Sequence, residues 1–275
     1  MRAHSDTITS EANGRVKEIM KLQKSSRERK KKRLFVAEGS RMLEEAFLYG
    51  KLQSVYFSES FREPDGREWE TLRREVPCEV IADSIFKKIA DTVTPQGVLG
   101  VVRMPEYAPE EILADERHCY MLTDDIRDPG NLGTIMRTAE GAGMSGVIMS
   151  RGTVDLFNPK VVRATMGAVF RVPFYCADDM CGMIEKLRTN DIPVYGMMLQ
   201  GSVLYDEPDY VRGAGIVVGN EANGISPETA RFLTGTVRIP MEGKLESLNA
   251  AVSAGVLMYE VARQRRLAHP DTVVL

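Results

Sequence analysis

Polar side chains stand at three places in this chain where a short predicted strand leads into a helix. In the first, Asn131 and Arg137 lie six residues apart in a glycine-rich segment that follows a strand and opens a helix. Six residues are less than two helical turns, so both side chains can face one cleft near the strand ends. A guanidinium in such a cleft can hold a phosphate or stabilise negative charge as it develops. The ordinary alternative is that Asn131 caps the helix and Arg137 is a solvated surface arginine.

The second place is the end of a strand of the buried type, residues 216–218. Gly219 follows this strand, and Glu221 and Gly224 lie in the loop after it. Because glycine has no side chain, Gly219 would let a ligand approach the backbone closely. The alternative is a tight turn with a solvated Glu221. Ser226 is expected to cap a helix that begins just beyond the loop.

The third place follows a short strand at residues 237–239, which Pro240 must end because proline cannot continue the hydrogen-bonded ladder. A polar loop comes next, and Ser247 and Asn249 then stand at the start of a helix. The helix is predicted from an apolar stripe at helical spacing, formed by Leu248, Val252, Val256 and Tyr259. Strand, loop and polar helix start together are typical of a ligand-binding corner. The alternative is that Ser247 only caps the helix.

The glycines of the first segment argue against a dinucleotide fold. They do not form the G-x-G-x-x-G pattern, since they stand at Gly130, Gly133, Gly141 and Gly143. No G-K-S/T phosphate loop occurs anywhere in the chain. A nicotinamide dehydrogenase is therefore disfavoured.

Strands and helices alternate over the second half of the chain, which predicts a parallel sheet with helices on both faces. Strands are expected at 120–123, 147–149, 194–198, 215–218 and 236–239. Helices are expected at about 131–142, 179–189, 227–233 and 248–265. The three polar segments then belong to one α/β domain.

The first ~100 residues also alternate, and they predict a second, smaller α/β domain. Strands are expected at 34–36, 52–57, 80–81 and 98–102, and helices at 12–26, 39–49, within 59–75 and at about 83–90. Two prolines and three acidic residues between 104 and 111 are typical of a linker. We therefore predict domains at 1–103 and 113–275, joined by a linker at 104–112.

Composition indicates an ordinary protein with a substantial core, because 43% of its 275 residues are hydrophobic and its net charge is -3. No apolar run has the length of a membrane span, and the polar residues 1–6 lack the apolar core of a signal peptide. The four cysteines show no C-x-x-C spacing, and only three histidines are present. We expect a cytoplasmic protein with no membrane association and no metal site.

A strongly basic run interrupts this slightly acidic chain between residues 24 and 33. Its seven cations, interrupted by a single glutamate, are Lys24, Arg27, Arg29, Lys30, Lys31, Lys32 and Arg33. Such a patch can neutralise phosphates even when the total charge of the protein cannot. A solvated charge run without function is the alternative.

Taken together, the three polar segments resemble the motifs of the SpoU (TrmH) family of RNA ribose 2′-O-methyltransferases, within the SPOUT class. The matching residues are Asn131-x-Gly133-x-Ile135-x-Arg137, then Gly219-x-Glu221-x-x-Gly224-Ile225, then Ile239-Pro240-Met241 with Ser247-Leu248-Asn249. Each motif is loose by itself, but the three in this order are specific. The resemblance covers the second domain and extends to the first through residues 35–39 and 94–97. It departs at residues 140–143, where relatives are more apolar, and we expect that change to affect helix packing rather than chemistry.

The resemblance implies a C-terminal parallel-sheet SPOUT domain whose chain forms a trefoil knot, a feature that periodicity does not predict. The knot loops of the family bind S-adenosylmethionine. By resemblance, the cofactor-binding residues are Gly219, Ile239, Leu248, Met198, Leu199 and Met241. Apolar walls and backbone groups suit an adenine better than charged side chains do.

The resemblance also assigns the chemistry, which is transfer of a methyl group to a ribose 2′-hydroxyl. The residue matching Arg137 is held essential in the family and has been cast as the base. Because a guanidinium stays protonated in proteins, we favour a role in holding phosphate and stabilising the developing alkoxide. Glu221, Ser247 and Asn249 are expected to orient Arg137 and the ribose, and Asn131 to support the same cleft. The sequence does not decide between base and stabiliser.

Partners follow from the same resemblance. The small first domain resembles the RNA-binding domain found beside this catalytic domain, which favours RNA contact by the basic run. Relatives form homodimers through the knotted domain, and the two-domain build favours ribosomal over transfer RNA by analogy. Two alternatives remain, a SPOUT enzyme that methylates a base and a non-catalytic RNA-binding relative. The nucleotide, any resistance role and any need for a ribosome-assembly intermediate are not determined by the sequence.

Overall fold

The computed structural model describes residues 7–62, 64, 66–199 and 203–270, so the polar N-terminal residues 1–6 lie outside the described part. The chain divides into two compact units. Unit 1 comprises residues 1–105 and 155–170, and unit 2 comprises residues 106–154 and 171–275. Among the described residues, no helix combines the length and the apolar character that crossing a membrane requires.

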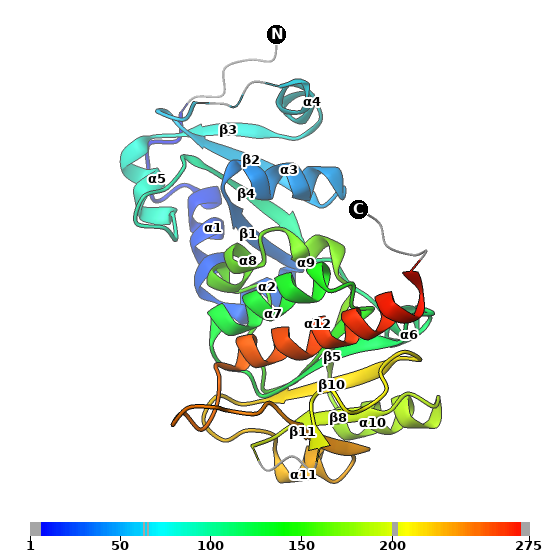
Figure 1. Cartoon of the computed structure of the whole chain (residues 1–275). Coiled ribbons are helices and arrows are strands. Elements are labelled where there is room, and N and C mark those ends of the chain that lie inside the picture. Colours follow the sequence, from blue (N-terminus) through cyan, green and yellow to red (C-terminus); the bar gives the residue numbers. More distant parts are fainter. Residues whose placement is uncertain (1–6, 63, 65, 200–202, 271–275) are drawn as a thin grey trace. The chain divides into compact units, whose positions relative to one another are not determined.

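Unit 1 is a four-stranded sheet with helices around it (Figure 1). Its elements are α1 (Gly14–Lys24), α2 (Ser26–Lys32), β1 (Leu34–Glu38), α3 (Ser40–Leu48), β2 (Leu52–Ser58), α4 (Arg67–Glu75), β3 (Cys78–Ile81), α5 (Asp83–Ile89), β4 (Val98–Arg103), α8 (Pro159–Thr165) and α9 (Ala168–Arg171) up to residue 170. The strand order is β1-β4-β2-β3. β4 runs antiparallel to β1 and β2, whereas β2 and β3 are parallel. The predicted small α/β domain is therefore present, with a mixed sheet.

Most of the basic run forms a helix of its own, α2, which the sequence analysis did not predict. Ser25 ends α1 and caps α2, because its hydroxyl accepts a hydrogen bond from the N–H of Glu28 at 3.2 Å. Arg33 ends α2 in the left-handed region, at φ 56°. The helix predicted at 12–26 thus ends at Lys24, and a second helix follows it directly.

Residues 155–170 complete the core of unit 1. Phe157 packs on Phe35 of β1 with ring centroids 4.9 Å apart, and Phe170 lies 6.1 Å from the same ring. The predicted second domain, residues 113–275, included this segment. Its helices α8 and α9 are too short to give a clear periodic pattern, so the sequence did not mark the segment as part of the first unit. The aromatic contacts connect residues more than a hundred positions apart, and no local pattern could reveal them.

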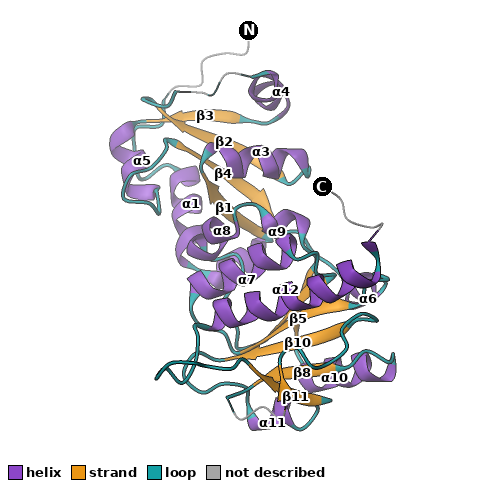
Figure 2. Cartoon of the chain, viewed as in Figure 1, coloured by secondary structure: helices purple, strands orange, loops and turns teal. Residues whose placement is uncertain are grey.

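Unit 2 is a parallel sheet with helices on both faces, as predicted, and it has seven strands where five were expected (Figure 2). Its elements are α6 (Pro109–Leu113), β5 (Cys119–Asp124), α7 (Pro129–Gly141), β6 (Gly146–Ser150), β7 (Phe174–Ala177), α10 (Met180–Thr189), β8 (Val194–Met197), β9 (Val203–Leu204), β10 (Ala214–Gly219), α11 (Pro227–Ala230), β11 (Gly235–Arg238) and α12 (Ala250–Ala268). The order is β7-β6-β5-β10-β8-β11-β9, and every neighbouring pair is parallel. Strands β5 and β10 are buried along their whole length, which explains their continuous apolar sequence.

The helices of unit 2 follow the alternation of the strand side chains. Tyr120 and Leu122 of β5 share a core cluster with the apolar side chains of α10. On the other face, α12 packs against α7 and β10. The sequence missed the short elements α6, β7 and β9, and it extended α11 beyond its observed end at Ala230.

The order of strands reverses direction at β5. From β5 the chain proceeds outward through β6 and β7, and it then returns to build β8, β10 and β11 on the other side. In open α/β sheets, ligands bind outside the carboxyl ends of the strands at such a switch point. Asp124 and Gly219, the last residues of β5 and β10, are register partners there.

Candidate active site

Three of the predicted site residues form a hydrogen-bonded chain at this switch point. Asn131 in the first turn of α7 donates from Nδ2 to Oε1 of Glu221 at 2.9 Å. Asn249 donates from Nδ2 to Oδ1 of Asn131 at 2.9 Å. Asn131 itself is 8% exposed. One residue from each of the three sequence motifs thus meets the others through side chains.

Glu221 also holds the start of α7. Its carboxylate accepts hydrogen bonds from the backbone N–H groups of Arg127 and Asp128, at 3.1 and 3.0 Å. Burial acts to raise the pKa of Glu221, but the bonds from Asn131, Asp128 and Arg127 outweigh it, so the pKa is lowered. A carboxylate beside the first backbone N–H groups of a helix also complements the helix dipole. Glu221 is therefore an ionised support for the loop that carries Asn131.

The N-caps of α7 and α12 are not the residues suggested as caps in the sequence analysis. α7 is capped by Asp128, whose carboxylate accepts from the N–H of Asn131 at 2.8 Å. α12 is capped by Asn249, whose Oδ1 accepts from the N–H of Ala251 at 2.9 Å. Neither Asn131 nor Ser247 is a cap, so the capping alternatives raised from the sequence do not hold for these two residues.

Arg137 lies further along α7 and is exposed. Within the described part of the chain it has neither a hydrogen bond nor an ion pair. Ser247 is exposed and likewise has no hydrogen-bond partner among the described residues. The structure therefore brings together Asn131, Glu221 and Asn249, and it leaves Arg137 and Ser247 free to meet a ligand.

Gly219 is required by the fold itself. A Cβ atom there would lie 2.1 Å from the carbonyl carbon of Gly224 and 2.2 Å from the N atom of Ile225. The loop after β10 is closed tightly over this position by paired backbone bonds between Asn220 and Gly224, both 2.9 Å long. The tight turn raised as the alternative is thus present at Gly219.

Asn220 is a site residue that the sequence analysis missed. Its Nδ2 donates to the backbone carbonyl of Asp125 at 2.8 Å, and its Oδ1 accepts from the N–H of Ala222 at 3.0 Å. It thereby ties the loop after β10 to the loop after β5. The signal that could have revealed it is the turn-forming Asn-x-x-Asn-Gly pattern at the strand end.

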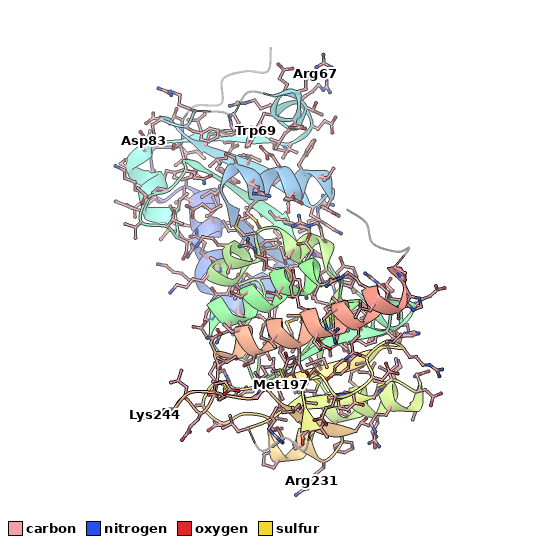
Figure 3. All side chains as sticks on the ribbon, viewed as in Figure 1. Arg67, Trp69, Asp83, Met197, Arg231 and Lys244 are labelled. Carbon is pink, nitrogen blue, oxygen red and sulfur yellow. The ribbon has the colours of Figure 1, made fainter. Side chains whose placement is uncertain are left out.

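The predicted cofactor-binding side chains lie on loops that leave the same edge of the sheet. β8 and β11 are parallel neighbours, with Met197 opposite Val237, so the segments that follow them emerge together. Met198 is half-buried against the core, whereas Leu199 is 60% exposed. Ile239, Met241 and Leu248 are half-buried. Figure 3 marks Met197 at the end of β8 and Lys244 on the loop between β11 and α12.

The basic run is largely exposed, with one exception that corrects the prediction. Arg29 is 3% exposed. It donates from Nε to Asp155 at 2.9 Å, and from Nη1 to the carbonyl oxygens of Leu22 and Gln23 at 2.7 and 3.0 Å. A phosphate cannot reach this guanidinium, because the Arg29 side chain points from α2 into the interior of unit 1. The exposed cations of the run are Lys24, Arg27, Lys30, Lys31, Lys32 and Arg33.

Comparison with known proteins agrees with this geometry. The model of the SpoU rRNA Methylase family matches residues 118–259, more than half of the chain. The chain belongs to this family. A second model, the MRM3-like substrate binding domain, matches residues 13–100. The resemblance drawn from the three motifs is thereby confirmed.

Relatives cover nearly the whole chain. The 23S rRNA (guanosine(2553)-2'-O)-methyltransferase RlmP of Bacillus subtilis is 32% identical over 255 residues, which are 92% of this chain and 98% of that protein. The mitochondrial rRNA methyltransferase 3 of Homo sapiens is 29% identical in a match that covers 92% of this chain and 73% of that protein.

Solved structures show the same fold. The AdoMet-bound rRNA methyltransferase from Sinorhizobium meliloti is 31% identical, with a TM-score of 0.81 over 95% of this chain and 98% of that chain. The SpoU methyltransferase AviRb from Streptomyces viridochromogenes, in complex with AdoMet, is 27% identical, with a TM-score of 0.83 over 92% of this chain and 98% of that chain. The predicted combination of a parallel-sheet domain with a smaller substrate-binding domain is confirmed.

Proposed function

We propose that this protein transfers the methyl group of S-adenosylmethionine to a ribose 2′-hydroxyl in ribosomal RNA. The observation that carries the proposal is the chain of hydrogen bonds from Asn249 through Asn131 to Glu221, which joins the three family motifs at the switch point. Family membership and the relatives named for rRNA 2′-O-methylation support the same reaction. Their names favour ribosomal RNA over transfer RNA.

The residues at the sheet edge fit the cofactor. Met198, Ile239 and Leu248 supply half-buried apolar surface on converging loops. Residues 241–248 make no backbone–backbone hydrogen bond among the described residues, so their N–H and C=O groups are available to recognise an adenine. S-adenosylmethionine, when bound, supplies an electrophilic methyl group on sulfur.

Arg137 acts on the ribose side of the reaction in this proposal. The 2′-hydroxyl is weakly acidic, so negative charge must be stabilised as its proton leaves. Because a guanidinium stays protonated in proteins, Arg137 holds the adjacent phosphate and stabilises the alkoxide rather than acting as base, and the hydroxyl proton passes to solvent water as the oxygen takes the methyl group. Its exposure and lack of a partner among the described residues suit a group reserved for substrate.

Asn131, Glu221 and Asn249 hold the frame around Arg137. Glu221 fixes the backbone N–H groups of Arg127 and Asp128 just before α7, and Asn249 links α7 to the start of α12. Arg137 is carried on α7, so its position depends on these bonds. Ser247 is exposed at the same helix start and is proposed to contact the ribose.

The remaining assignments extend the proposal to the whole chain. Residues 1–103 bind substrate RNA through the exposed cations of the basic run, 104–112 join the domains, and 113–275 carry methyl transfer. The match of residues 13–100 to a substrate-binding domain supports this division. A trefoil knot around the cofactor loops and a cytoplasmic location are proposed from the family.

A homodimer through the C-terminal domain is also proposed. Val252 and Tyr259 are 52% and 49% exposed on α12, where a second subunit could cover them. Size-exclusion chromatography with light scattering tests this. A monomer at micromolar concentration would contradict it.

The experiment that tests the reaction is transfer of labelled methyl from S-adenosylmethionine to total bacterial RNA, separated by size and digested to nucleosides. Label in a 2′-O-methylnucleoside from ribosomal RNA is the expected result. Label in a methylated base would identify a SPOUT base methyltransferase instead. Cofactor binding without label would indicate that an assembly intermediate is the substrate. Absence of both would leave a non-catalytic RNA-binding relative.

A further inference from the structure

We propose that Arg127, held in place by Asp125, is a second phosphate anchor that positions the substrate RNA beside the reacting ribose. This inference rests on the proposed function, since it concerns the RNA side of the same site. Arg127 belongs to none of the matching family motifs and lies in the loop between β5 and α7. Its backbone N–H donates to Glu221, so the residue is part of the hydrogen-bonded frame of the site.

The side chain of Arg127 is presented to solvent rather than used in the core. It is 65% exposed, and its one ion pair among the described residues joins Nη2 to Oδ1 of Asp125 at 2.7 Å. A guanidinium offers five N–H donors in a planar fork, so most of them stay available to a phosphate. An ion pair this exposed adds little to stability.

Asp125 is nevertheless held in an unusual backbone conformation. Its φ is 63°, in the left-handed region, which aspartate adopts more readily than most residues with a side chain. Its N–H donates to Oγ of Ser150 at 2.9 Å, and its carbonyl accepts from Asn220 at 2.8 Å. The surrounding loops therefore impose this conformation from both sides.

Gly152 provides the room that the Asp125 carboxylate needs. A Cβ atom at Gly152 would lie 2.0 Å from Oδ1 of Asp125 and 3.6 Å from Nη2 of Arg127. Any side chain at position 152 would thus push the ion pair out of place. A left-handed aspartate and a glycine that leaves room for its carboxylate both serve a pair that contributes little stability, which indicates a functional reason for placing Arg127.

The charge of the site supplies that reason. The segments around the switch point carry four carboxylates, on Asp124, Asp125, Asp128 and Glu221. These would repel the phosphates of an approaching RNA unless cations compensate them. Arg137 is one such cation, and Arg127 is the other arginine of the same segment. Two arginines can hold two phosphates and so define the register of the RNA strand.

The test compares Arg127→Gln with Arg151→Gln as a matched control. Arg151 lies in the loop after β6, is 80% exposed, and pairs with the equally exposed Asp178 at 3.4 Å. Methyl transfer to bacterial ribosomal RNA is measured at several RNA and salt concentrations, and S-adenosylmethionine affinity is measured by calorimetry. For Arg127→Gln we expect KM for RNA to rise about tenfold, the loss of one charge-assisted bond, and the salt slope to fall by about one. kcat at saturating RNA and cofactor affinity should stay near wild type.

Gly152→Ala tests the positioning role of Asp125. It should reproduce the rise in KM in part, with the guanidinium still present, and Arg127→Lys should restore only part of the affinity. Equal KM and salt slope in Arg127→Gln and Arg151→Gln would overturn the inference, even if Gly152→Ala fails to fold. Wild-type protein that transfers no methyl would instead contradict the proposed function.

Discussion

Helices α2 and α7 each carry an arginine that the sequence marked as an RNA contact, and the fold treats the two in opposite ways. Arg29 of α2 is enclosed in unit 1, with Asp155 and two backbone carbonyls satisfying its donors. Arg137 of α7 is exposed and has no partner among the described residues. The difference teaches that an arginine in a motif or a basic run gains its role from what surrounds it, since a satisfied guanidinium has no donors left for a ligand.

The largest effect is expected at Arg137. We expect Arg137→Ala to reduce methyl transfer by about 10³-fold, because a group that stabilises developing charge is lost. Binding of S-adenosylmethionine should be nearly unchanged. Thr134→Ala, at an exposed position one turn earlier on α7, serves as the control. Near-normal turnover in Arg137→Ala would show that Arg137 is an ordinary surface arginine with no role in methyl transfer.

The next effect is on stability rather than activity. Arg29→Met should lower the free energy of unfolding by about 3 kcal/mol, because it leaves the Asp155 carboxylate without its buried partner. Urea unfolding followed by Trp69 fluorescence measures this, since Trp69 is the one tryptophan of the chain and is buried in unit 1. Lys30→Met, at an exposed position on the same helix, should change it by less than about 0.5 kcal/mol. Equal losses in the two variants would remove the contrast between α2 and α7.

A third experiment measures how much the exposed cations at the end of α1 and on α2 contribute to RNA binding. Replacing Lys24, Arg27, Lys30 and Lys31 together by Ala should weaken RNA binding and lower the slope of log affinity against log salt by up to about 3. Arg29→Met should leave that slope as it is. Fluorescence anisotropy with labelled ribosomal RNA measures both. If the four substitutions leave the salt slope unchanged, the basic run is only a solvated charged surface that does not contact RNA.

The smallest effect concerns an arginine–carboxylate pair of intermediate burial in unit 2. Hydrogen bonds from the Arg117 side chain, opposed by burial and aided by Ser145, lower the pKa of Asp115 to about 2. A carboxylate with a lowered folded-state pKa contributes stability above its ordinary pKa near 4, and the contribution disappears as pH falls towards 2. Since Arg117 is 48% exposed, Asp115→Asn should cost only about 1 kcal/mol at pH 7 and almost nothing at pH 2. A loss that does not depend on pH would show that packing, not charge, holds this pair.

Local sequence patterns were sufficient for the architecture of unit 2. Its five predicted strands all occur, because continuous apolar runs such as residues 216–218 can only be buried in a sheet covered on both faces. The order of the three motifs along the chain was sufficient for the family. Short elements such as β9 and α9 escaped prediction because segments this short carry little periodic signal of their own.

The site was predicted as a set of residues but not as an arrangement. Asn131 is 90 positions from Glu221 and 118 from Asn249 along the chain. Only the order of strands in the sheet brings the three within hydrogen-bonding distance. The sequence also could not place Gly219 against the backbone of Gly224 or Gly152 against the carboxylate of Asp125, because both approaches depend on how the chain folds back on itself. The functions of these glycines are set by steric exclusion, which exists only in three dimensions.

The amino-acid sequence by itself determined the types of side chain available, the α/β class and the family, because these follow from local periodicity and ordered motifs. The tertiary structure alone decided which cations remain free. Arg29 and Lys30 are neighbours in one basic run, yet the packing of residues 155–170 buries the first and leaves the second in water. Burial is a property of the whole fold, and the availability of a charged group for a ligand depends on it.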